Sequence, residues 1–310
     1  MVSRQMTHLT QLLRTARSAA PTVEPTVQSR RAGFAAMLTA LPPVPGGITS
    51  AVDAGGVPAE WTQVEGMDPQ TGTLLYFHGG GYVQGSPTTH RRLVTAICRA
   101  AGFRALSVDY RLAPEDPFPA ALEDVLTAYR WLTGPAGVEP GRVVVAGDSA
   151  GGGLAAALLL ALLAGDEAQP AGAYLMSPWT DLAGTGASLR SRASVDPLIA
   201  GDGVPIVAAM YAGGHALTDP LVSPLYGDFA GAPPMLIQAG DLEVLLDDSV
   251  RLAERATAAG VDAELRVWPG AFHVFQIMVG LVPEADEAVE QAGAWMSALL
   301  SDPATPAPGR

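Results

Sequence analysis

Residues 143–164 read VVVAGDSAGGGLAAALLLALLA, which places a run of valines, a cluster of small residues and an Ala/Leu-rich segment in direct succession. The apolar run Val143–Ala146 predicts a buried strand, and the run Gly152–Leu163 predicts a helix packed in the interior. Between them, Gly-Asp-Ser-Ala-Gly at 147–151 has the spacing of a nucleophile elbow, in which small residues on either side of a serine let the backbone turn sharply. This stretch predicts an α/β fold that presents Ser149 at the end of a central strand.

From residue 73 onward, short apolar runs alternate with helical patterns. Such alternation is typical of βαβ units and predicts a mostly parallel central sheet flanked by helices. The other expected strands are Thr73–Phe77, Ala105–Val108, Ala173–Met176, Met235–Ala239 and Leu265–Trp268. The other expected helices are Arg91–Ala101, Ala120–Leu132, Leu246–Ala259 and Glu284–Leu300.

Three segments depart from this alternation. Residues 1–41 carry apolar side chains at helical spacing, and the prolines and glycines of 42–47 end that pattern. Residues 183–218 are rich in Gly, Ser and Pro around a short apolar stretch and are expected to be an insertion. We therefore expect an N-terminal helical segment over 1–45, a main domain over 46–300 that contains the insertion, and a disordered tail over 301–310.

The composition narrows the class of protein. Of 310 residues 48% are hydrophobic, and 31 acidic side chains oppose 18 basic ones, all arginine, for a net charge of −13. Such a chain repels phosphate backbones and anionic lipids, so we expect no nucleic-acid or membrane binding and a small neutral substrate. The absence of lysine excludes Schiff-base chemistry. Cys98 is expected to be a buried apolar filler, and the N-terminus lacks the apolar core of a secretory signal, which predicts a cytoplasmic protein.

A second glycine-rich element follows the expected strand Thr73–Phe77, where residues 78–82 read HGGGY. Consecutive glycines can aim backbone N–H groups at one point, as an oxyanion hole requires for acyl transfer. We expect this hole to comprise Gly79, Gly80 and Gly81, the latter two favoured, together with the N–H of Ala150. A phosphate-binding loop is disfavoured for residues 78–82, because a nearby lysine and a Gly-x-Gly-x-x-Gly spacing are both absent.

A serine nucleophile needs a base, and histidine accepts and returns a proton near neutral pH. His8, His90 and His215 are expected at the surface or at helix caps, and His78 is expected to anchor the glycine loop by hydrogen bonding. His273 follows the last expected strand after a short loop, where the order Ser, acid, His places the base. We therefore predict His273 as the general base.

The third member of such a triad is a carboxylate in the loop after Met235–Ala239. Asp247 and Asp248 begin the helix that follows, where the helix dipole favours carboxylates, so they are expected to be capping residues. Asp241 and Glu243 both lie in the loop itself. Position alone leaves these two open.

Together these motifs resemble the hormone-sensitive-lipase family of microbial esterases, in the α/β-hydrolase superfamily. The resemblance spans about residues 72–274 and rests on HGGGY at 78–82, VDYRLAPE at 108–115, GDSAGG at 147–152, SPWTDL at 177–182, DPLVSPL at 219–225 and the His273 loop. Where the family commonly has Asp-Pro-Leu, this chain departs with Glu243-Val244-Leu245. Because some members carry Glu there, the resemblance implies Glu243 as the acid, with Asp241 and Asp247 as the alternatives.

The same resemblance implies further features of this chain. It implies a helical cap formed by residues 1–45 and 183–218, and no metal or organic cofactor. Asp109, Tyr110 and Arg111 would be structural residues below the site, and the Asp148 side chain would support it without reacting. Some relatives form homodimers through the edge of the last strand, so a homodimer is also an expectation.

The sequence thus predicts a serine carboxylesterase acting on short- to medium-chain acyl esters, with Ser149 as nucleophile, His273 as base and Glu243 as the residue that orients the imidazole. An amidase, lactonase or deacetylase would share this triad and stays open as an alternative. A non-catalytic receptor on the same fold is disfavoured, because such receptors lose the histidine that this chain retains at position 273.

Overall fold

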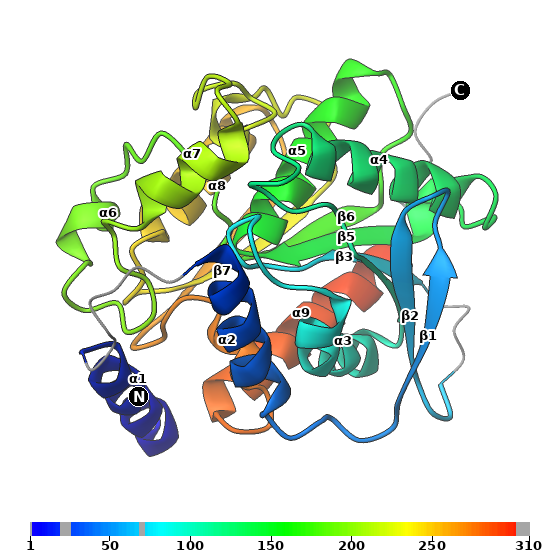
Figure 1. Cartoon of the computed structure of the whole chain (residues 1–310). Helices are drawn as coiled ribbons and strands as arrows, with labels where there is room; N and C mark the ends of the chain where they lie inside the picture. The colour runs from blue at the N-terminus through cyan, green and yellow to red at the C-terminus, as the bar shows by residue number, and fades with distance from the viewer. Residues whose placement is uncertain (1, 19–25, 68–71, 302–310) are drawn as a thin grey trace.

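The computed structural model describes residues 2–18, 26–67 and 72–301 and has an α/β architecture around one central sheet (Figure 1). Within these residues the sheet has eight strands in the order β1-β2-β4-β3-β5-β6-β7-β8. The strands are β1 (Gly47–Asp53), β2 (Pro58–Val64), β3 (Thr73–Phe77), β4 (Arg104–Val108), β5 (Val143–Asp148), β6 (Gly172–Met176), β7 (Met235–Gly240) and β8 (Ala263–Trp268).

The sheet is parallel from β4 to β8, and β1 and β2 add an antiparallel edge. The carboxyl ends of parallel strands meet at one edge of a sheet, which is where open α/β folds build their sites. The loops after β3, β5, β7 and β8 therefore converge, although they are far apart in the sequence.

The strand β5 shows why this sheet is apolar on both faces. Val143 and Val145 pack into one apolar cluster, whereas Val144 and Ala146 pack into a second cluster on the opposite face. Successive side chains of a strand point to opposite faces, so a strand covered on both sides must be apolar at every position. Burial on both faces therefore explains why the apolar run at 143–146 is uninterrupted.

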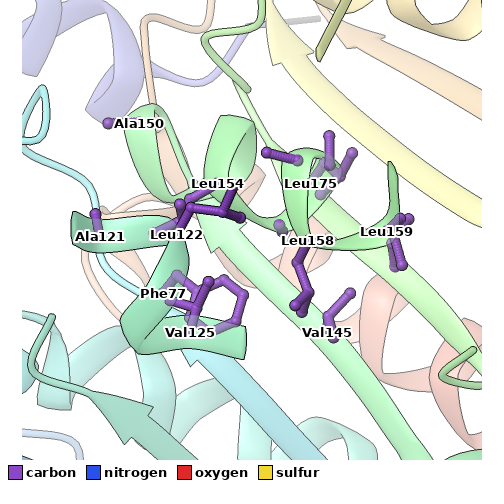
Figure 2. Close-up of a cluster of buried hydrophobic side chains, with 14 of the residues drawn as sticks. Phe77, Ala121, Leu122, Val125, Val145, Ala150, Leu154, Leu158, Leu159 and Leu175 are labelled. Atoms are coloured by element: carbon purple, nitrogen blue, oxygen red, sulfur yellow. The ribbon is translucent and has the colours of Figure 1, made fainter. Parts of the chain in front are cut away.

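Helices cover both faces of the sheet (Figure 1). One face carries α3 (Pro87–Ala101) and α9 (Pro283–Ser301), and the other carries α4 (Ala120–Thr133), α5 (Ala150–Ala164) and α8 (Leu246–Ala258). Figure 2 shows the contact of the sheet with α4 and α5, where Phe77 and Val145 lie beside Val125, Leu154 and Leu158. This packing holds the first turn of α5 against the end of β5.

The N-terminal segment and the insertion supply the remaining α-helices of the described residues. These are α1 (Arg4–Ser18), α2 (Val27–Thr39), α6 (Ser188–Ser191) and α7 (Val204–Ala212), and short 3₁₀ helices cover Pro140–Arg142, Pro224–Tyr226 and Phe275–Met278. Arg14 and Arg17 of α1 donate to the backbone carbonyls of Val195 and Asp196 in the insertion. The two segments are therefore joined directly by hydrogen bonds.

All six strands expected from the sequence are present, as are the helices that were expected to cover them. The strands β1 and β2 were not predicted. The strand β1 reads GITSAVD, is mostly exposed and has no apolar alternation that would have indicated it. The helix α3 begins four residues before the expected start, with Ser86 as its N-cap and Pro87 in its first turn. Of the tail expected to be disordered, Ser301 ends α9 and residues 302–310 lie outside the described residues.

Two smaller expectations concern single features of the chain. Cys98 is fully buried, and this burial raises the pKa of its thiol to about 12, as suits an unreactive core residue. Within the part of the chain that the structure describes, no helix combines the length and the apolar character needed to cross a bilayer.

Candidate active site

Ser149 occupies the sharp turn between β5 and α5. Its backbone has φ 53° and ψ −118°, a strained combination for a residue with a side chain. The turn depends on two glycines: a Cβ at Gly147 would come within 2.3 Å of the Gly151 backbone, and one at Gly151 within 2.0 Å of the Phe77 carbonyl oxygen. The glycines thus let α5 pass close to β3 and β5, as the elbow spacing predicted.

His273 lies in the loop after β8, and its ring faces the carboxylate of Glu243 in the loop after β7. His273 Nδ1 is 3.5 Å from Glu243 Oε2, which is longer than an ordinary hydrogen bond. The Glu243 side chain is fully buried, and its Oε1 has no hydrogen-bond partner among the described residues. The structure therefore brings together His273 and Glu243, the residues that the sequence predicted as base and acid.

Ser177 fixes the arrangement of these two loops. Its hydroxyl donates to Glu243 Oε2 at 2.7 Å and accepts a hydrogen bond from the Val274 N–H at 3.0 Å. The Gly240 N–H donates to the same carboxylate oxygen at 3.3 Å. In the sequence Ser177 stood out only as part of a motif and received no role, because nothing local shows that its hydroxyl bridges two distant loops.

The environment of His273 favours its protonated form. Burial of the ring lowers its pKa, but the facing Glu243 carboxylate and the negative charges of Asp196 and Asp148 outweigh this effect and raise the pKa above 6.5. Asp196 was not singled out in the sequence. It is a buried carboxylate of the insertion that accepts a hydrogen bond from the Val244 N–H at 2.9 Å, next to Glu243.

The other carboxylates near β7 accept hydrogen bonds from backbone N–H groups and do not face His273. Asp241 Oδ1 accepts from the Gly270 N–H at 2.7 Å. Asp247 and Asp248 lie in the first turn of α8, as expected, but their expected capping role was wrong, because the N-cap is Leu245 without a side-chain bond. Asp247 instead accepts from a backbone N–H of the insertion, and Asp248 Oδ2 accepts from two backbone N–H groups after β6. Of these acids, Glu243 is the one placed against His273.

In the glycine loop, the structure contradicts one of the expected oxyanion-hole donors, Gly79. The N–H of Gly79 donates to Asp148 Oδ1 at 2.9 Å, so it is not available to a substrate. Gly80 and Gly81 have φ values of 121° and 65°, which glycine adopts readily, and both line the cavity that contains Ser149. The N–H groups of Gly80, Gly81 and Ala150 have no acceptor among the described residues.

Asp148 and its partners form a buried polar cluster beneath the glycine loop. Asp148 accepts from the Tyr76 hydroxyl at 2.5 Å, and His90 Nε2 lies 3.4 Å from its other oxygen. Burial raises the pKa of Asp148, but His90, Tyr76 and His78 outweigh that effect and lower it below 3.8. Asp148 thus acts as the expected supporting residue. The surface or cap position expected for His90 was wrong, because its side chain is 1% exposed and the N-cap of α3 is Ser86.

The remaining histidines and the residues below the site have structural contacts. His8 and His215 are exposed, as expected. His78 donates from Nδ1 to the Gly79 carbonyl at 2.8 Å, which is the expected anchoring bond. The Tyr110 hydroxyl donates to the His78 carbonyl at 2.6 Å, and Arg111 pairs with Asp124.

A cavity of about 660 Å³ opens over Ser149 and His273. Most of its wall is apolar and comes from α1, α2, the insertion and the loop after His273; contributing side chains include Leu13, Phe34, Leu198, Val207, Ile277 and Met278. Within residues 2–18, 26–67 and 72–301, no group of three or more His, Cys, Asp and Glu side chains is placed to hold a metal ion. Ser149 and His273 thus face one apolar space, as a nucleophile and its base would.

Comparisons with known proteins identify the family of this chain. A family described as the alpha/beta hydrolase fold matches residues 74–277. The chain is similar to an acetyl-hydrolase of Streptomyces hygroscopicus, with 44% identity over 79% of this chain and 81% of that protein, and to an esterase of Acinetobacter venetianus, with 36% identity over 77% and 79%. It is also similar to the crystal structure of an esterase from the bacterial hormone-sensitive lipase family, with a TM-score of 0.92 and 42% identity over 97% of this chain and 100% of that one.

Proposed function

This chain belongs to the hormone-sensitive-lipase family of α/β hydrolases and is a carboxylesterase, and from this premise we propose that it cleaves short- to medium-chain acyl esters through Ser149, His273 and Glu243. The proposal rests on one observation: a serine on a strained elbow and a histidine backed by a buried carboxylate line the same cavity.

In the proposed acylation step, His273 takes the proton of the Ser149 hydroxyl as its oxygen attacks the ester carbonyl. Negative charge then develops on the former carbonyl oxygen, and the N–H groups of Gly80, Gly81 and Ala150 are the donors available to stabilise it. The buried carboxylate of Glu243 orients the imidazole and stabilises its positive charge. The protonated His273 gives its proton to the departing alcohol.

In the proposed deacylation step, His273 removes a proton from water, and the resulting hydroxide attacks the acyl-enzyme carbonyl. The tetrahedral intermediate collapses, the carboxylic acid leaves and the proton returns to the Ser149 oxygen. Both steps need neutral His273 at the start, so the raised pKa of this residue is expected to set the acid limb of the pH profile.

The preference for short to medium acyl chains is supported by two features. The cavity volume of about 660 Å³ and its apolar wall suit a modest hydrocarbon chain. The relative in Streptomyces hygroscopicus is named an acetyl-hydrolase, which suggests that a small acyl group is accepted in this family branch.

The test is a series of p-nitrophenyl esters from acetate through octanoate to palmitate. We expect the highest kcat/KM at or below octanoate and a loss of about 10⁶ in kcat for Ser149→Ala and for His273→Ala. The exposed Ser50 of β1 provides a matched control, and Ser50→Ala should retain wild-type rates. Wild-type rates in Ser149→Ala would contradict the triad, and a maximum at palmitate would contradict the chain-length assignment. Faster cleavage of the matching p-nitroanilide would identify an amidase.

A further inference from the structure

Arg30 is the arginine that lines the cavity of the proposed active site. The other described charged or titratable side chains of the lining are Asp148 and His90, which are buried beside each other, His273, and the exposed Asp202 of the insertion. Arg30 therefore supplies a positive charge to a wall that is otherwise mostly apolar, in a protein whose net charge is −13.

The guanidinium of Arg30 is left unpaired by the part of the chain that the structure describes. Its side chain is half-buried, and the described residues provide it with no hydrogen bond and no ion pair. The adjacent Arg31 is the opposite case, because its guanidinium binds Glu115 Oε2 at 2.7 Å and the carbonyls of Val83 and Ala113. Two neighbouring arginines of α2 thus differ in role: Arg31 fastens the helix to the main domain, and Arg30 is available at the cavity.

The face of α2 that carries Arg30 leads toward the catalytic residues. Arg30 and Phe34 are four residues apart, so their side chains lie one above the other on the same helix face, about 5–6 Å apart at Cβ. The Phe34 ring packs against the ring of His90, with centroids 6.1 Å apart, and His90 lies beside Asp148, the residue before the nucleophile. Arg30 is therefore one helical turn from the part of the wall nearest to these residues.

We propose that Arg30 makes this cavity select esters that carry a carboxylate at the end of the acyl chain, such as monoesters of dicarboxylic acids. The planar guanidinium can donate two parallel hydrogen bonds to a carboxylate, while the apolar wall accommodates the methylenes between that carboxylate and the scissile carbonyl. The negative net charge of the protein had suggested a neutral substrate. A bound acyl chain, however, is affected mainly by the charges that line the cavity, and Arg30 is a positive charge there. This inference rests on the proposed function and adds a charge preference to it.

The test compares matched pairs of methyl esters, monomethyl adipate with methyl hexanoate and monomethyl suberate with methyl octanoate, followed by acid release in a pH-stat. The measured quantity is the ratio of kcat/KM for the carboxylate ester to that for the neutral ester. In Arg30→Gln this ratio should fall by roughly threefold to tenfold through KM, as expected for a partly exposed charge-assisted contact. Arg30→Lys should restore part of it, and added salt should lower the ratio of the wild type but not of Arg30→Gln.

Two further variants separate a specific contact from a change in overall charge. Arg142 is exposed at the opposite end of β5, so Arg142→Gln changes the net charge equally and should leave the ratio unchanged. Asp202→Asn removes the carboxylate on the insertion wall and should raise the ratio. An equal ratio in Arg30→Gln and the wild type, with both hydrolysing the neutral esters, would overturn this inference alone. Failure of the wild type on every ester would instead overturn the proposed function.

Discussion

The Glu243 carboxylate has one oxygen bound by Ser177 and the Gly240 N–H, and the other has no partner among the described residues. If this carboxylate stabilises the protonated imidazole, Glu243→Gln should lower kcat by about 10³- to 10⁴-fold, because an amide has no charge to offer. Asp241→Asn removes the alternative acid and should cost less than about tenfold. Steady-state kinetics on p-nitrophenyl butyrate compares the two, and the reverse ranking would assign the acid to Asp241.

Asp196, a residue of the insertion, also affects the pKa of His273. Its negative charge is one of the influences that raise the pKa of His273. Asp196→Asn should therefore lower that pKa, so that the acid limb of the kcat/KM profile moves to lower pH. The profile measured between about pH 5 and 9 checks the direction, with the exposed Asp228→Asn as a control of equal charge. An acid limb that stays in place or moves to higher pH would show that Asp196 does not act through His273.

Replacing a glycine by alanine is expected to have opposite effects on protein stability in the helices α5 and α2. Gly151→Ala should destabilise the protein by more than about 3 kcal/mol, because the new Cβ would overlap the Phe77 carbonyl in a part of the fold that cannot move apart. Gly33 lies exposed within α2, with nothing within 4 Å of the place that a Cβ would occupy, so Gly33→Ala should stabilise by roughly 0.5–1 kcal/mol. Urea unfolding measures both, and equal effects would contradict the close approach of α5 to β3.

The stability of the whole molecule should depend on pH through His78. Burial lowers the pKa of this ring to about 3, whereas in the unfolded chain it is about 6.5. Between these values the unfolded chain binds the proton and the folded protein does not, so the contribution of His78 is fully present above pH 6.5 and is lost as pH falls toward 3. From pH 7 to pH 5 the loss is about 2 kcal/mol.

A variant is needed to measure this contribution, because burial raises the pKa of Asp248 to about 7 and this carboxyl acts in the opposite direction over the same range. His78→Asn keeps a donor near the Gly79 carbonyl but loses the ring that stacks on Tyr110. It should be less stable than the wild type at pH 7, with a difference that shrinks by about 2 kcal/mol at pH 5. Urea unfolding at both pH values provides the comparison, and a constant difference would contradict a buried neutral His78.

The sequence by itself determined the features that depend on neighbouring residues. The apolar run of β5, the two glycines around Ser149 and the helix behind them are contiguous, so their pattern predicted strand, elbow and helix at the observed places. The position of His273 followed from the same logic, because a short loop after the last strand reaches the sheet edge where parallel strands end.

Only the tertiary structure decided how distant groups share their partners. It placed Glu243 against His273 while Asp241 binds the Gly270 N–H, and it bound the Gly79 N–H to Asp148. Buried polar groups must find partners wherever the fold brings them, and those partners are separated by tens of residues along the chain. Local patterns encode secondary structure, whereas hydrogen bonds and charges within a site depend on which loops meet in space.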